Sequence, residues 1–175
     1  MTAQPMTPEL RPHATLEPLL TQLGYDLMVL QRNLEGVSHA DSLLPPQPGG
    51  NCLNWVVGHL VATRNRWLAA LGLPQVIDPA RVAAYARGAA PSAGGVPAVP
   101  LAELLAAFAA AQGPIAEAMR RLGAEELAAP APFSPVNDPR ETLGSLLTAL
   151  CFHEAYHLGQ TGLLRRIAGH PGAIR

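Results

Sequence analysis

Two histidines stand four residues apart near the end of the chain, in the segment HEAYHLGQ at residues 153–160. With the glutamate between them they form H-E-x-x-H, the motif in which zinc peptidases bind the metal through both histidines and use the glutamate as a general base. On a helix, His153 and His157 lie one turn apart on one face, so both imidazoles can reach one divalent ion. The segment therefore predicts half of a metal site, and the remaining ligands decide its function.

A peptidase would need a further ligand downstream of this motif. The long metzincin form requires Gly and His where this chain has Gln160 and Leu163. Residues 158–175 contain no Asp or Glu, and His170 follows the expected helix about 20 Å along its axis from His157. The sequence therefore argues against an H-E-x-x-H peptidase.

A third ligand is available upstream. His59 lies in the segment NWVVGHLVATR, in the apolar body of another predicted helix. Buried histidines without a metal would each need hydrogen-bond partners in an apolar interior, whereas a shared ion satisfies all of them. Three neutral imidazoles leave positions for water or substrate, as a catalytic metal requires, and the scarcity of carboxylates on the other helices argues against a di-iron bundle.

Four further residues are candidates for roles at this site. Glu154 is a candidate acid–base residue or a partner that orients an imidazole, with a solvated or salt-bridged side chain as the alternative. Gln160 shares the helix face of the two histidines and could line the site. Arg66, two turns after His59 on the same face, could bind a substrate carboxylate or phosphate, or pair with an acid. Trp55 is a candidate for the pocket wall or for the core.

The elements that position these residues are predicted to be helices. The chain is 49% hydrophobic but only 5% aromatic, is rich in Leu and Ala, and has few β-branched residues. This composition favours an all-α protein. We expect four long helices in a four-helix bundle, at about residues 15–36, 52–71, 101–122 and 138–168. The last should begin at DPRE, with Asp138 as its N-terminal cap.

The chain is predicted to hold a single domain. Residues 1–12 contain three prolines and little apolar content, which predicts a disordered tail, and residues 13–175 suffice for one helical core. The connection at residues 72–100 is long and partly rich in Pro and Gly, with a short helix expected near residues 79–87. It permits a crossover between the second and third helices, and we expect it to control access to the site.

Charge and cysteine content exclude several classes of protein. The net charge of −1 implies neither a nucleic-acid partner nor a membrane surface. All twelve basic residues are Arg, so a lysine Schiff base is excluded. Cys52 and Cys151 form no C-x-x-C pair and suggest neither a disulfide framework nor a cysteine-rich zinc site. The first residues lack a signal-peptide pattern and no run is long enough to span a membrane, so we expect a cytoplasmic protein.

Two segments carry a resemblance to a known family. N-W-x-x-G-H-L around His59, and H-E-x-Y-H-x-G-Q followed by L-L-R-R, resemble the DinB-like (DinB/YfiT) family over most of the chain. The resemblance implies an up-down-down-up four-helix bundle with one divalent ion per chain, nickel or zinc, held by residues corresponding to His59, His153 and His157. It also implies a low-molecular-weight thiol cosubstrate, such as bacillithiol or mycothiol, and a homodimer. Many relatives have H-x-x-H-H-R-G-Q, and this chain lacks that basic pair.

These observations favour a metal-dependent enzyme that transfers a low-molecular-weight thiol to a small electrophile. The metal would lower the pKa of the bound thiol and so supply the nucleophile. A metal-dependent hydrolase of a small substrate, with water in place of the thiol, is one alternative. A non-catalytic bundle that binds a metal or a ligand is the other, and a site closed by four protein ligands would favour it.

Overall fold

Four long helices carry the described part of the chain. The structure is a computed structural model that describes residues 12–89 and 98–174. The long helices are α1 (Pro12–Leu34), α3 (Leu53–Ala70), α5 (Leu101–Arg121) and α7 (Leu143–Ile167). The short ones are α2 (His39–Ser42), α4 (Pro79–Val82), the 3-10 helix η1 (Ala83–Tyr85) and α6 (Ala124–Ala128). The expected all-helical class is confirmed for the described residues, in which one isolated bridge is the only β pairing. Apart from Pro12, the expected tail lies outside them.

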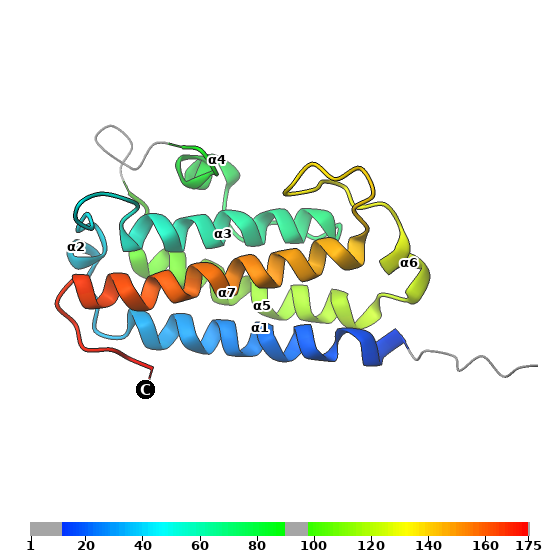
Figure 1. The fold of residues 1–175 in the computed structure, drawn as a ribbon, viewed down its shortest axis with the longest axis horizontal. Helices are drawn as coiled ribbons and strands as arrows, with labels where there is room; N and C mark the ends of the chain where they lie inside the picture. Colours follow the sequence, from blue (N-terminus) through cyan, green and yellow to red (C-terminus); the bar gives the residue numbers. More distant parts are fainter. Residues whose placement is uncertain (1–11, 90–97, 175) are drawn as a thin grey trace, which may run out of the picture.

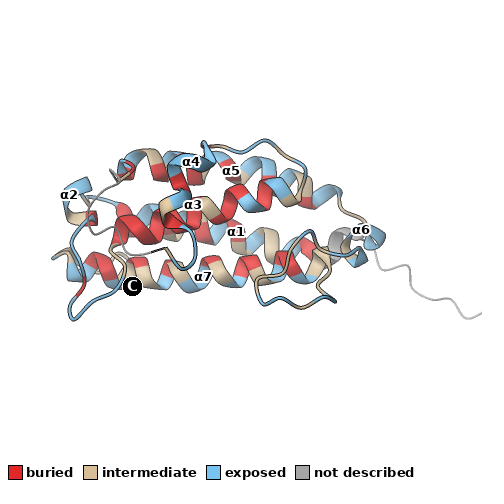
Figure 2. Cartoon of the chain, turned by 90° about the horizontal axis from the view of Figure 1, so that it is seen from above, coloured by how far each residue is buried: buried red, intermediate tan, exposed pale blue. Residues whose placement is uncertain are grey.

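The long helices pack in a ring. Helix α1 lies against α5 and α7, and α3 lies against the same two helices (Figure 1). Their buried residues face inward (Figure 2) and form two apolar clusters, one containing Leu60 and Phe108 and the other Trp67 and Leu146. Each large apolar side chain that is fully buried stabilises the folded state by about 1.5–3 kcal/mol. The apolar side chains between the helices thus stabilise the ring. Within it, α3 and α7 are direct neighbours.

Helix α3 is buried on nearly every side. Helix α4 and η1 pack over its outer face, as Figure 1 shows, and they correspond to the short helix expected near residues 79–87. Tyr85, only 2% exposed, fixes this cover. Its hydroxyl donates to the Asn54 side chain and accepts from the backbone N–H of Val99, both at 2.9 Å. The described part of the long connection is therefore bound to the bundle.

The expected start of the last helix is wrong. Helix α7 begins at Leu143, and the hydroxyl of Thr142 caps it by accepting from the backbone N–H three residues on. Asp138 instead accepts from the backbone N–H of Arg140 at 2.9 Å in a local turn. Asp138 and Thr142 are both capping residues by type. Backbone hydrogen bonds between residues 141–143 and residues 129–131 keep the chain extended after Asp138. Helix formation therefore starts after Thr142.

A buried ion pair joins α3 to α7. Arg64 donates from Nε and Nη2 to the two carboxylate oxygens of Glu154, at 2.7 and 2.9 Å, and both side chains are fully buried. The third nitrogen, Nη1, donates to the carbonyl of Phe108 on α5 at 2.8 Å. Asp26 on α1 lies close by and is 5% exposed. Burial, and then the charge of Glu154, raise the pKa of Asp26 to about 7, against a lowering by Arg64.

Replacing Asp26 with Asn should remove a pH dependence of stability. The carboxyl has an ordinary pKa of 3.8, so between there and about 7 the folded state alone holds this proton. Binding this proton therefore stabilises the folded state. The stabilisation is fully present below pH 3.8 and is lost as the pH rises through the folded-state pKa of about 7. Between pH 5 and pH 8 the free energy of unfolding of the native protein, relative to Asp26→Asn, should fall by roughly 2–3 kcal/mol. Urea denaturation of both proteins measures this, and an equal difference at the two pH values would refute it.

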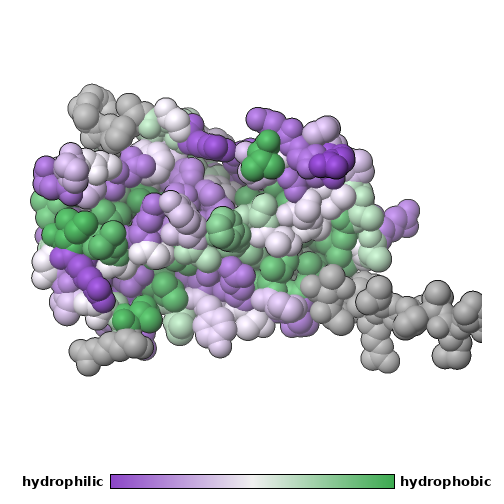
Figure 3. Space-filling model, in the orientation of Figure 1, coloured by the Kyte–Doolittle hydropathy of each residue, from purple (hydrophilic) through white to green (hydrophobic). Residues whose placement is uncertain are grey.

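Several large hydrophobic side chains are exposed on α1 and α7. Met28, Phe152, Leu163 and Ile167 are between 44% and 70% exposed. Figure 3, in the orientation of Figure 1, shows hydrophobic residues in separate groups among hydrophilic ones. The expected homodimer stays a prediction. No helix in residues 12–89 and 98–174 combines the length and the hydropathy that crossing a membrane requires.

Candidate metal centre

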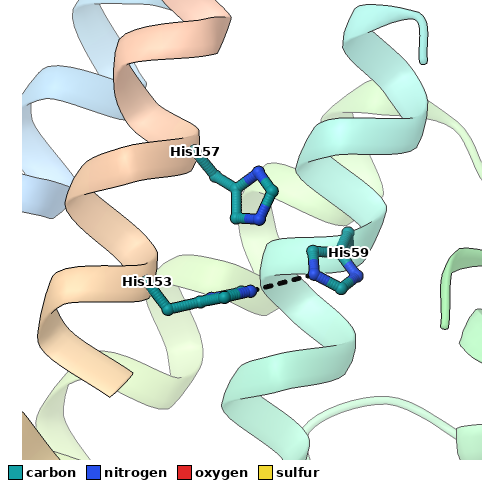
Figure 4. A group of neighbouring side chains, drawn as sticks. All are labelled: His59, His153 and His157. Carbon is teal, nitrogen blue, oxygen red and sulfur yellow. Dashed lines mark hydrogen bonds between the residues drawn. The ribbon is translucent and has the colours of Figure 1, made fainter. Parts of the chain in front are cut away.

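Helices α3 and α7 bring His59, His153 and His157 together as one group, here called the histidine triad (Figure 4). The Nε2 atoms of His59 and His153 are 3.0 Å apart, and each residue offers a nitrogen within 4.8 Å of the other two. Two imidazoles that bind one ion at about 2.0–2.1 Å place their nitrogens about 3.0–3.4 Å apart. The triad therefore fits a divalent ion after small side-chain rotations.

His59 is held in one orientation by the segment that covers α3. Its Nδ1 lies 2.7 Å from the carbonyl oxygen of Tyr85. A carbonyl only accepts hydrogen bonds, so Nδ1 carries the proton and the neutral ring presents the lone pair of Nε2 to the triad. Gly58 permits this contact because a Cβ there would lie 2.5 Å from the Tyr85 ring. The Gly-His pair of the sequence motif thus has a packing reason.

The two histidines of α7 differ in their second partners. The Nδ1 of His157 lies 2.7 Å from Oε1 of Gln160, one turn further on. With the amide oxygen as acceptor, the Nε2 of His157 is also left as a lone pair. The Nδ1 of His153 is buried and has no partner within the described residues. Gln160 therefore contacts the triad through His157, and its expected role in lining a substrate site stays a prediction.

The surroundings keep the triad neutral. Burial lowers the pKa of all three imidazoles, and that of His153 falls to about 4. The positive charges of Arg66 and Arg87 lower the pKa of His59 and of His153 further. Neutral imidazole is the form that binds a metal, so the triad needs to release few protons on binding at pH 7.

Trp55 packs directly against the triad. Its ring is stacked on that of His59, with centroids 5.0 Å apart and an angle of 10° between the planes. Trp55 is 5% exposed and belongs to the apolar core, and its role in a pocket wall stays a prediction. His59 is 8% exposed, whereas His153 and His157 are half-buried. The accessible side of the triad is therefore the side of α7.

Glu154 does not take the role that was considered first. Its carboxylate is turned into the bundle and bound by Arg64, and it makes no hydrogen bond to the triad among the described residues. The Tyr85 carbonyl and Gln160 orient imidazoles instead. The salt-bridged alternative is the one seen, because α7 turns about 100° per residue and points position 154 away from position 153.

Two residues near the triad, Tyr85 and Arg87, were not predicted from the sequence, and the role of Arg66 stays open. Tyr85 acts through its backbone carbonyl, which no residue type signals, and only Gly58 pointed to a close approach. Arg87 lies beside the triad because the long connection folds over α3. Arg66 is exposed, its Cζ lies 4.1 Å from the centroid of the Phe133 ring, and it pairs with no acid within the described residues. Its contact with an anion stays a prediction.

Comparison with known proteins places the chain in a family. A model of the DinB superfamily matches residues 22–161, a stretch that includes the whole histidine triad, and the chain belongs to this superfamily. The fold is also similar to the crystal structure of a conserved protein from Enterococcus faecalis, with a TM-score of 0.68 and 16% identity over 87% of this chain and 96% of the other. A search of curated proteins gave no match.

Proposed function

We propose that this protein is an enzyme that transfers a low-molecular-weight thiol to a small electrophile, with one divalent ion held by the histidine triad. The observation that carries the proposal is the convergence of neutral imidazoles from two helices, with His59 and His157 holding their Nδ1 protons on fixed acceptors. Three protein ligands leave a position open for water or substrate, which is typical of catalytic sites. Imidazole ligands suit nickel and zinc.

The chain itself offers no reactive thiol in its interior. Cys151 is 1% exposed, and burial, followed by the charges of Glu154 and Asp26, raises its pKa to about 12. A thiol with that pKa is protonated at pH 7 and is a poor nucleophile. Cys151 is thus unsuited to act as the nucleophile, and we expect a bound small molecule to supply the thiol instead.

The residues around the triad have separable tasks. A divalent ion, when bound, would act as a Lewis acid that lowers the pKa of a bound thiol or water. The Tyr85 carbonyl and Gln160 restrain the rings of His59 and His157, so that only small rotations are needed when an ion binds. Trp55 shields one face of His59 from water. The charges of Arg66 and Arg87 favour an anionic nucleophile over its neutral form.

The proposed frame for this site is a four-helix bundle in up-down-down-up order. Two observations support it. The four long helices contact one another in a ring, and in Figure 1 α1 and α7 run in one direction and α3 and α5 in the other. Residues 71–100 give the chain enough length to return along the bundle between α3 and α5. This order makes the two ligand-bearing helices neighbours.

The test is turnover that needs both the metal and a thiol. Metal-depleted protein is loaded with Ni²⁺ or Zn²⁺ and given 1-chloro-2,4-dinitrobenzene with glutathione, bacillithiol or mycothiol in turn. We expect conjugate formation above the uncatalysed rate with at least one thiol, and none after His157→Ala. Metal-dependent consumption of an ester substrate without any thiol would instead favour the hydrolase. Equal turnover by metal-free protein would contradict both reactions.

A further inference from the structure

Two arginines from different parts of the chain lie beside the histidine triad. Arg66 is two turns after His59 on α3, on the same face of the helix. Arg87 follows η1, two residues after Tyr85, whose carbonyl accepts the hydrogen bond from His59. Both arginines are exposed. The fold therefore brings one guanidinium group from α3 and one from the segment after η1 toward the same site.

One loop holds both guanidinium groups. Between α6 and α7, the ring of Phe133 lies under Arg66, with the guanidinium carbon 4.1 Å from the ring centroid. Two residues later, the carbonyl of Pro135 accepts a hydrogen bond of 2.9 Å from Nη1 of Arg87. A ring face and a carbonyl position a guanidinium without neutralising it, and each leaves other N–H groups free to donate.

These two arginines have no acidic partner among the described residues, whereas several other exposed arginines do. Arg81, Arg121 and Arg140 each pair with a carboxylate on the surface. Arg66 and Arg87 pair with none in residues 12–89 and 98–174, and the sequence of residues 90–97, next to Arg87, contains no Asp or Glu. Two positive charges beside the triad are thus left for a partner from outside the chain.

The positive charges at the site favour the binding of an anion. The triad would hold a divalent cation, and the two arginines come from α3, which carries His59, and from the segment just after Tyr85, whose carbonyl is bound by His59. Glu154, the acidic residue next to the triad in sequence, is fully buried and neutralised by Arg64. Among the described residues, no salt bridge at the site therefore offsets the charges of the two arginines.

We propose that Arg66 and Arg87 form an anion-binding pair that holds a carboxylate group of the substrate while its reacting atom lies at the histidine triad. A guanidinium offers two parallel N–H groups that match the two oxygens of a carboxylate. The inference rests on the proposed function for the location of the reacting atom, but the pair binds its anion through its own donors. The substrate would accordingly be a small organic acid.

Calorimetric titration with succinate tests the pair separately from the metal. Succinate is added to the Zn²⁺-loaded and to the metal-free protein, and to Arg66→Gln, Arg87→Gln and the double variant. Each single substitution should weaken succinate binding about 10-fold, and the double one about 100-fold, since each removes charged hydrogen bonds. Arg121→Gln, which removes an exposed arginine on α5, is the matched control and should leave the affinity unchanged.

The outcomes separate this inference from the proposed function. If the protein binds no metal, the proposed function fails, yet the metal-free titration still tests the arginine pair. Equal succinate affinity in the native protein and the double variant, or no binding at all, would overturn the pair. Tighter binding of inorganic phosphate than of succinate would overturn the assignment to a carboxylate. Loss of Zn²⁺ from the arginine variants would also overturn it, because the residues would then act through the metal site.

Discussion

His157→Ala is expected to lower the affinity of the protein for Ni²⁺ and Zn²⁺ by about 100-fold or more, because loss of a partner that only orients a ligand already costs 10–100-fold. The substitution removes one of three converging imidazoles and leaves His59 and His153 to hold the ion alone. Gln160→Leu should have a smaller effect, since it releases only the Nδ1 of His157 from its acceptor. Competition with a chelator of known affinity, followed by elemental analysis, measures both changes.

A matched histidine provides the control for this result. His170 lies after α7, and its Nε2 is 3.3 Å from a carboxylate oxygen of Asp41, away from the triad. His170→Ala should therefore bind the same amount of metal as the native protein, with the same affinity. If His157→Ala retains one tightly bound ion per chain, the ion lies elsewhere and the assignment of the triad fails.

Breaking the buried ion pair should be the most destabilising change in the bundle. Arg64→Met leaves the carboxylate of Glu154 uncompensated in a fully buried position, and loss of one member of such a pair costs about 3–5 kcal/mol. Glu154→Gln should cost less, because Asp26 lies nearby and can ionise beside Arg64 once the charge of Glu154 is gone. A larger loss of stability in Arg64→Met than in Glu154→Gln would thus show that Asp26 interacts with the pair. Urea denaturation measures both free energies of unfolding.

The double variant Arg64→Met with Glu154→Leu sharpens this prediction. It removes both charges and replaces them with apolar side chains of similar size, so it should be more stable than Arg64→Met alone. A free energy of unfolding within about 1 kcal/mol of the native value for Arg64→Met would show that the pair is not buried as described. So would a double variant whose loss equals the sum of the losses of Arg64→Met and of Glu154→Leu, each measured alone.

The fold was largely predictable because the leucine spacing marks the helices. The third helix was expected at residues 101–122 and is observed as α5, Leu101–Arg121, and the second was expected at residues 52–71 and is observed as α3. The start of α7 was not predictable. Asp138 and Thr142 both carry valid capping patterns, and the choice between them follows from backbone hydrogen bonds to a distant segment. Local sequence does not contain that information.

The three histidines of the candidate site could be predicted from the sequence, but the groups that orient their side chains could not. Histidines at i and i+4 share a helix face whatever the rest of the chain does, so His153 and His157 could be paired from the sequence alone. Neither the Tyr85 carbonyl nor the turning of Glu154 toward Arg64 could be predicted in this way. Both depend on how separate elements pack: the cover of η1 over α3, and the contact between α3 and α7. Side-chain partners across helices require the tertiary structure.

Diffraction data collected at the nickel and zinc absorption edges, from protein purified without a histidine tag, test the central claim most directly. We predict one anomalous peak per chain between α3 and α7, with nitrogens of His59, His153 and His157 at about 2.0–2.1 Å and at least one remaining position filled by an exchangeable small molecule. A peak elsewhere in the chain would contradict the account. So would an ion at the triad enclosed by a fourth protein ligand, because such a site has no place for a thiol.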